Sequence, residues 1–156
     1  RTCRYVIPCK AYGLEGIQLF CADRSLWQER SLHTRLFTFL CLLQRELPGA
    51  VWHALGVFPA PYIAVYTARF LGLPAVVSYN RASLRDEPQH AFECQWVAQH
   101  TSLALVTNTA DQQRLLETRG GQPTRVQVMP PNRSQAVSIL IMRYRSLQEA
   151  VTRESA

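Results

Sequence analysis

Four short apolar segments recur at nearly even intervals through the middle of the chain. They begin near residues 51, 75, 103 and 126, so successive starts lie 24, 28 and 23 residues apart. Continuous apolar runs of this length are typical of strands that are buried on both faces in a parallel sheet. Each interval is long enough to hold one crossover helix. The sequence therefore predicts an α/β fold, a doubly wound and Rossmann-like parallel sheet in three α/β/α layers.

Helical signals fill the intervals between these segments and extend to both sides. From Leu32, leucine and phenylalanine recur at i, i+4, i+7 and i+8, which predicts an amphipathic helix that Pro48-Gly49 ends. Gly72 and Gly120 follow the expected ends of two later helices. In chain order, we expect helices over 31–47, 61–71, 86–100, 110–119 and 134–156. Before them, 4–8 and 16–21 have the character of two short strands.

The length of 156 residues fits one domain. Hydrophobic residues make up 47% of the chain and charged residues 18%, a balance that supplies a packed core and argues against an intrinsically disordered chain. No apolar run approaches the roughly 18 residues that a membrane-spanning helix needs. We expect residues 1–133 to form the Rossmann-like domain and residues 134–156 to form a helix that packs back on it.

The charge is strongly basic, with 17 basic against 11 acidic residues and a net charge of +6. Every basic residue except Lys10 is arginine, whose planar guanidinium suits phosphate and carboxylate groups. An anionic partner is therefore allowed. The arginines are scattered and no aromatic-basic motif accompanies them, so nucleic acid is not an expected partner.

Cysteine and histidine spacing gives no metal site. The five cysteines are Cys3, Cys9, Cys21, Cys41 and Cys94. They contain no C-x-x-C pair, so neither a zinc site nor a redox dithiol is predicted. A reduced, cytoplasmic compartment is the simplest expectation, with a Cys3–Cys9 or Cys9–Cys21 bridge left open. The four histidines lack metal-ligand spacing, and His53, inside an apolar strand, is expected to be a hydrogen-bonded core residue.

Polar residues follow the predicted strands at the edge where ligands bind in open α/β sheets, beyond the carboxyl ends of the strands. The candidate substrate-binding residues are Gly56, Asn80, Arg81, Ser83, Arg85 and Asn108. Amide, hydroxyl and guanidinium groups suit sugar hydroxyls or phosphate better than acid–base chemistry. The sequence also has no G-x-S-x-G elbow, Walker loop or G-x-G-x-x-G motif. No catalytic residue, metal or cofactor is therefore assigned.

Residues 48–133 carry several segments that occur in the same order in a known family. The strand W-H-A-L-G-V-F-P is similar to a family strand V-I-H-A-H-G-x-F-P, and F-L-G-L-P is similar to a helix end L-L-G-I-P. The segments V-V-S-Y-N-R-A-S, L-A-L-V-T-N-T and V-Q-V-M-P-P-N-R follow at the matching places. This part of the chain resembles the N-terminal domain of GT-B retaining glycosyltransferases of family 4. Leu55 and Asn80 stand where that family has histidines.

The resemblance implies an acceptor-side domain of an enzyme that moves a sugar from a nucleotide-sugar donor to an acceptor. It implies that the donor binds a C-terminal domain, whose E-x7-E motif this chain does not contain, so the chain alone is expected to be inactive. The implied partners are that donor-binding domain, a sugar or lipid-linked acceptor, and a peripheral membrane contact. Asn80 and Ser83 would position hydroxyls, and Arg81 or Arg85 would meet a phosphate. The alternative is a non-catalytic Rossmann-like module that binds a protein partner or an anionic surface.

Overall fold

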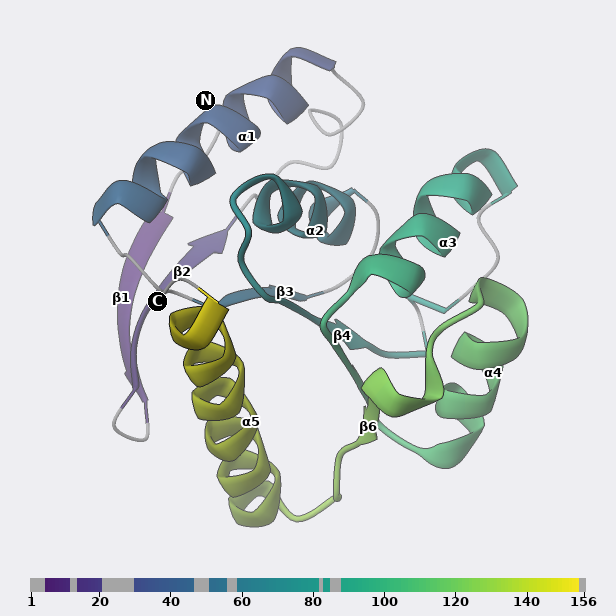
Figure 1. Cartoon of the computed structure of the whole chain (residues 1–156). Coiled ribbons are helices and arrows are strands. Elements are labelled where there is room, and N and C mark those ends of the chain that lie inside the picture. Colours follow the sequence, from purple (N-terminus) through teal and green to yellow (C-terminus); the bar gives the residue numbers. More distant parts are fainter. Residues whose placement is uncertain are drawn as a thin grey trace.

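The computed structural model describes residues 5–11, 14–20, 30–46, 51–55, 59–81, 83–84 and 88–154. Their strands are β1 (Tyr5–Ala11), β2 (Leu14–Phe20), β3 (Trp52–Leu55), β4 (Ala75–Tyr79), β5 (Leu103–Val106) and β6 (Val126–Val128). Their α-helices are α1 (Arg30–Glu46), α2 (Ala60–Phe70), α3 (Ala91–His100), α4 (Thr109–Arg119) and α5 (Arg133–Glu154). Figure 1 shows the sheet of β3 to β6 in the middle of the molecule, with helices on either side of it.

The central sheet confirms the predicted α/β class. Strands β3, β4, β5 and β6 are parallel and lie side by side in that order. Each begins at or within one residue of its predicted start at 51, 75, 103 or 126. The register pairs Val76 with Leu103 and Val77 with Ala104, so the continuous apolar runs lie side by side in the middle of the sheet. All four residues of β5 are buried, as expected for a strand covered on both faces.

The winding of the sheet differs from the prediction. The strand order follows the chain without a reversal, so the three crossovers β3-α2-β4, β4-α3-β5 and β5-α4-β6 all step in one direction. Crossovers of one hand that step in one direction place their helices on one face of the sheet. A doubly wound sheet needs a reversal of direction, and the four described strands contain none.

The two faces of the sheet are covered by different elements. On one face, Val77 and Tyr79 of β4 pack in a core cluster with buried residues of α2, α3 and α4. On the other face, Val76 forms a second cluster with Leu103 and Leu105 of β5. Leu140, Tyr144 and Leu147 of α5 pack against that second cluster. The sheet therefore has α2 to α4 on one side and α5 on the other (Figure 1).

Local sequence signals account for most helix ends. Proline lies in the first turn of α2, where its missing N–H costs no hydrogen bond. Helix α4 ends at Gly120, whose φ of 63° lies in the left-handed region that glycine adopts without strain. The third helix starts later than the predicted residue 86, because Pro88–His90 form a 3-10 turn and α3 begins at Ala91. Outside the parallel sheet, β1 and β2 pair as an antiparallel two-stranded sheet.

Candidate functional site

Three asparagines lie at the carboxyl edge of the sheet, one after each of the strands β4, β5 and β6. Each side-chain Oδ1 accepts a hydrogen bond from the backbone N–H three residues further along the chain. The donor–acceptor distances are 2.9 Å for Asn80 with Ser83, 2.8 Å for Asn108 with Asp111 and 3.1 Å for Asn132 with Gln135. At the edge of the sheet where a ligand was expected, these asparagines therefore also close a turn or cap a helix.

Asn80 and Ser83 together close the turn that follows β4. The Ser83 hydroxyl accepts from the backbone N–H of Asn80 at 2.8 Å and donates to the Asn80 carbonyl at 2.8 Å. The same carbonyl accepts from the N–H of Leu84 at 3.1 Å. Ser83 is only 6% exposed, so its hydroxyl is occupied inside the turn. Asn80 and the neighbouring Arg81 are exposed residues, and the hydrogen bonds of this turn do not use the Asn80 amide Nδ2 or the Arg81 guanidinium.

Asn108 caps α4 and also holds a buried carboxylate. Its Nδ2 donates to Oδ2 of Asp111 at 2.9 Å, and the Thr107 hydroxyl donates to the same oxygen at 2.6 Å. Asp111 is 8% exposed and lies in the first turn of α4, where the helix dipole favours a negative charge. Each polar atom of the Asn108 side chain therefore has a partner within the chain. The arrangement stabilises the start of α4, and Asn108 is exposed but its polar atoms are already hydrogen-bonded.

The structure thus sorts the predicted site residues into three groups. Asn80 and Arg81 offer exposed donors beside each other at the end of β4. Ser83 and Asn108 lie at the same edge but are used in local hydrogen bonds. Gly56 and Arg85 lie outside the described residues. What remains for a ligand is a small donor-rich surface that suits hydroxyl or phosphate oxygens.

A second polar cluster joins the sheet to α5. The Nε2 of His53 on β3 lies 2.7 Å from the Ser78 hydroxyl on β4. Its Nδ1 is hydrogen-bonded to the hydroxyl of Tyr144 on α5, and the two rings meet edge to face with 5.8 Å between their centroids. A neutral imidazole has one donor and one acceptor nitrogen, so both nitrogens are satisfied. The expectation of a hydrogen-bonded His53 is confirmed, whereas its partners were not predicted.

The electrostatics of this cluster argue against general-base chemistry. Burial lowers the pKa of His53 from 6.5 to about 4, so the ring is neutral at pH 7 and is a weak base. Burial also raises the pKa of Tyr144, whose hydroxyl stays protonated. In a serine–histidine triad the third group is a carboxylate that stabilises the imidazolium, and a neutral phenol cannot do so. The serine, histidine and tyrosine therefore form a structural connection between β3, β4 and α5.

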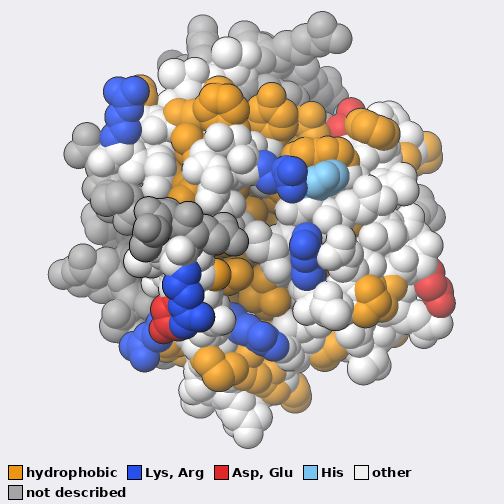
Figure 2. Space-filling view, viewed as in Figure 1, with side chains coloured by type: hydrophobic (Ala, Val, Ile, Leu, Met, Phe, Trp, Pro, Cys, Tyr) orange, Lys and Arg blue, Asp and Glu red, His pale blue; other side chains and the backbone are white. Residues whose placement is uncertain are grey.

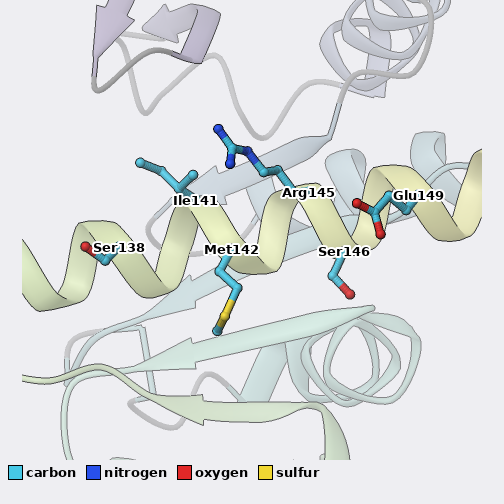
Figure 3. A pocket seen from close by; sticks show the side chains of 6 residues that line it. All are labelled: Ser138, Ile141, Met142, Arg145, Ser146 and Glu149. Carbon is cyan, nitrogen blue, oxygen red and sulfur yellow. The ribbon is translucent and has the colours of Figure 1, made fainter.

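A shallow hollow of about 510 Å³ lies along α5. It is lined by Ser138, Ile141, Met142, Arg145, Ser146 and Glu149. Figure 3 shows these side chains spaced along the helix, with Ile141 and Arg145 on one side and Met142 and Ser146 on the other. None of the predicted site residues lines it. The hollow is therefore a feature of the helix surface and does not coincide with the carboxyl edge of the sheet.

The part of the chain that the structure describes contains neither a group of metal ligands nor a membrane-spanning helix. Within the ranges given above, histidine, cysteine and carboxylate side chains form no group of three that could hold a metal ion. Cys41 and Cys94 do not form a disulfide. No helix among those residues is both long and apolar enough to cross a membrane.

The chain has no match in the comparisons with known proteins: no family model, curated protein or solved structure matches it.

Proposed function

We propose that this chain is the acceptor-side domain of a retaining glycosyltransferase of the GT-B type, with α/β/α layering. In that role it binds a sugar or lipid-linked acceptor, and a separate domain holds the nucleotide-sugar donor. A cytoplasmic location at the periphery of a membrane goes with this proposal. The parallel sheet and the surface chemistry of its carboxyl edge support it.

One observation carries the proposal. Four of the segments that resemble the glycosyltransferase family fall, in order, on consecutive parallel strands, and F-L-G-L-P falls at the end of α2. W-H-A-L forms β3, the V-V-S-Y part forms most of β4, L-A-L-V forms β5 and V-Q-V forms β6. In open α/β sheets the loops after the strands form the ligand-binding edge. The resembling segments therefore end where an acceptor would bind.

The exposed donors at the end of β4 supply the chemistry of recognition. A guanidinium forms paired, charge-assisted hydrogen bonds with phosphate, and an amide donates to a sugar hydroxyl. In the proposed site, Arg81 meets a phosphate of the acceptor and the Asn80 amide meets a neighbouring hydroxyl. Catalysis requires stronger binding of the transition state than of the ground state, which needs both acceptor and donor in place. The domain alone binds an acceptor without turning it over.

The test is a titration of the chain, followed by NMR of backbone amides, with sugar phosphates and separately with nucleotide sugars. We expect sugar phosphates to shift the amides of Arg81, Ser83 and Leu84, and nucleotide sugars to bind weakly. Arg81→Gln should weaken sugar-phosphate binding about tenfold or more, because a charge-assisted hydrogen bond is lost. Arg153→Gln is the matched control, since Arg153 is 82% exposed on α5. Tight binding of a nucleotide sugar, or equal effects of the two variants, would count against the proposal.

An exposed aromatic surface favours a second candidate, a non-catalytic module that binds a protein partner or an anionic surface. Phe37 on α1 contacts the rings of Tyr66 and Phe70 on α2, with centroid separations of 5.8 and 5.2 Å. Phe70 is 67% exposed and Leu42 on α1 is 53% exposed. Figure 2 shows hydrophobic side chains gathered along the part of the surface that α1 and α2 occupy in Figure 1. Exposed apolar patches of this kind mark interaction sites.

The second candidate is tested with a polar substitution in this aromatic surface. Phe70→Gln should abolish pelleting of the chain with anionic vesicles or its self-association in light scattering, whichever occurs. Met142→Gln on α5 is the control, because Met142 is also exposed, at 58%. If neither association occurs, or if both variants behave like the original chain, this candidate is wrong.

A further inference from the structure

Helix α5 is long but weakly anchored. None of its residues, Arg133–Glu154, is buried, whereas the half-as-long α2 has five buried residues. Its apolar contact with the sheet consists of Leu140, Tyr144 and Leu147 against the cluster of Val76, Leu103 and Leu105. Elements that bury little apolar surface open at a lower free energy than the core. We therefore expect α5 to open at a lower free energy than β3 to β6.

The polar connection at the centre of this contact contains a histidine that burial keeps neutral at pH 7. His53 lies between Ser78 and Tyr144, and both of its ring nitrogens are hydrogen-bonded. A proton on the ring adds a positive charge to a partly buried site that α5 contacts through Tyr144. Burial disfavours the charged form of such a group unless an opposite charge compensates it.

Neither hydrogen-bond partner of His53 supplies such an opposite charge. From β4, the group that faces the imidazole is the uncharged Ser78, and from α5 it is Tyr144. Arg143, next to Tyr144 on α5, carries a positive charge and donates to Oε1 of Gln127 on β6 at 2.9 Å. The hydrogen bonds and ion pairs of the described residues bring no carboxylate to His53. When α5 moves away, more water reaches His53 and the charged ring regains favourable hydration.

We propose that α5 is a pH-released strap: protonation of His53 detaches α5 and uncovers the apolar face formed by Val76, Leu103 and Leu105. Released, the sheet exposes three side chains that are 0%, 6% and 4% exposed when α5 is docked. The change is local because β3 to β6 keep their core on the opposite face, against α2, α3 and α4.

The direction and size of the pH effect on α5 docking follow from the pKa of His53 in the docked and released states. With α5 docked, burial lowers the pKa of His53 to about 4, and with α5 released the ring is hydrated and returns toward 6.5. The released state therefore binds the proton more strongly, and docking weakens as the pH falls below 6.5. Between pH 8 and pH 5 this difference in pKa lowers the equilibrium constant for docking of α5 about thirtyfold. The effect saturates below pH 4.

Hydrogen exchange of the whole chain, followed by mass spectrometry from pH 8 to pH 5 and corrected for the intrinsic exchange rate, tests the proposal. We expect the opening equilibrium of residues 133–154 to rise about thirtyfold while that of β5 changes less than about threefold. His53→Gln, which keeps an uncharged hydrogen-bonding group, should make the opening of α5 independent of pH. His90→Gln, a histidine substitution on the 3-10 turn before α3, should leave the pH dependence intact.

Two outcomes would overturn the proposal. Loss of protection in α5 and β5 together, with the same pH dependence, would mean global unfolding. Persistence of the pH dependence in His53→Gln would assign it to another group. If that variant fails to fold, an NMR titration of the imidazole in the original chain replaces it. The midpoint of the imidazole must then coincide with the loss of the Tyr144 backbone amide signal, and a mismatch contradicts the proposal.

Discussion

Replacement of Asn108 by alanine separates the structural role of the carboxyl edge from ligand binding. The variant loses the cap from Oδ1 to the Asp111 N–H, a kind of bond worth about 1 kcal/mol. It also removes one of the two side-chain donors to the Asp111 carboxylate, at 8% exposure, and a hydrogen bond to a charged group contributes about 1.5–3 kcal/mol. We expect Asn108→Ala to lower the free energy of unfolding by about 2.5–4 kcal/mol. For a chain of this size that lowers Tm by about 5–15 °C.

Urea and thermal unfolding of the alanine, serine and aspartate variants of Asn108 separate the contribution of the helix cap from that of the hydrogen bond to the Asp111 carboxylate. Asn108→Ser keeps an oxygen for the cap but loses the donor to Asp111, so it should lose about 1.5–2 kcal/mol. Asn108→Asp keeps the cap oxygen but sets a second carboxylate beside Asp111, so at pH 7 it should be less stable than the serine variant. A loss below about 0.5 kcal/mol in Asn108→Ala would refute the capping role, since that is the range of neutral surface substitutions.

Three further substitutions, with Leu116→Ala as a comparison for the first, test the core and the turns. Leu115→Ala removes a side chain that is 0% exposed in the main core and should cost about 2–5 kcal/mol, whereas Leu116→Ala at a half-buried position should cost less, by urea unfolding. Gly120→Ala should cost about 1 kcal/mol or more, because φ is +63° and its Cβ would lie 3.3 Å from Gln99 Nε2. Ser83→Ala should lower Tm by a few degrees, since the Asn80 N–H loses its acceptor.

The parts of the fold that could be predicted are those that local sequence determines. A run such as L-A-L-V has no polar face, so it requires cover on both sides wherever it occurs, and β5 lies where the sequence indicates. The ends of α2 and α4 follow from proline and glycine conformations that do not depend on distant contacts. These signals act within a few residues.

The strand order and the polar cluster could not be predicted in the same way. Whether successive crossovers step in one direction or reverse depends on packing between helices, which the spacing of strands does not record. His53 and Tyr144 are 91 residues apart, and no local pattern links them. The available signal was indirect: a histidine and a serine inside apolar strands require buried partners. It indicates that a partner exists and does not identify it.

Choosing candidate residues only because they follow a strand gives too many ligand-binding residues in this fold. In a βα unit the carboxyl end of a strand is followed by the start of a helix, and that start needs side-chain acceptors for its free N–H groups. Asparagine after a strand is therefore expected whether or not a ligand binds, and Asn108 and Asn132 meet that need. Only groups left over after capping can recognise a ligand. At the end of β4 those are the Asn80 amide and the Arg81 guanidinium, so a functional test of this edge must be directed at them.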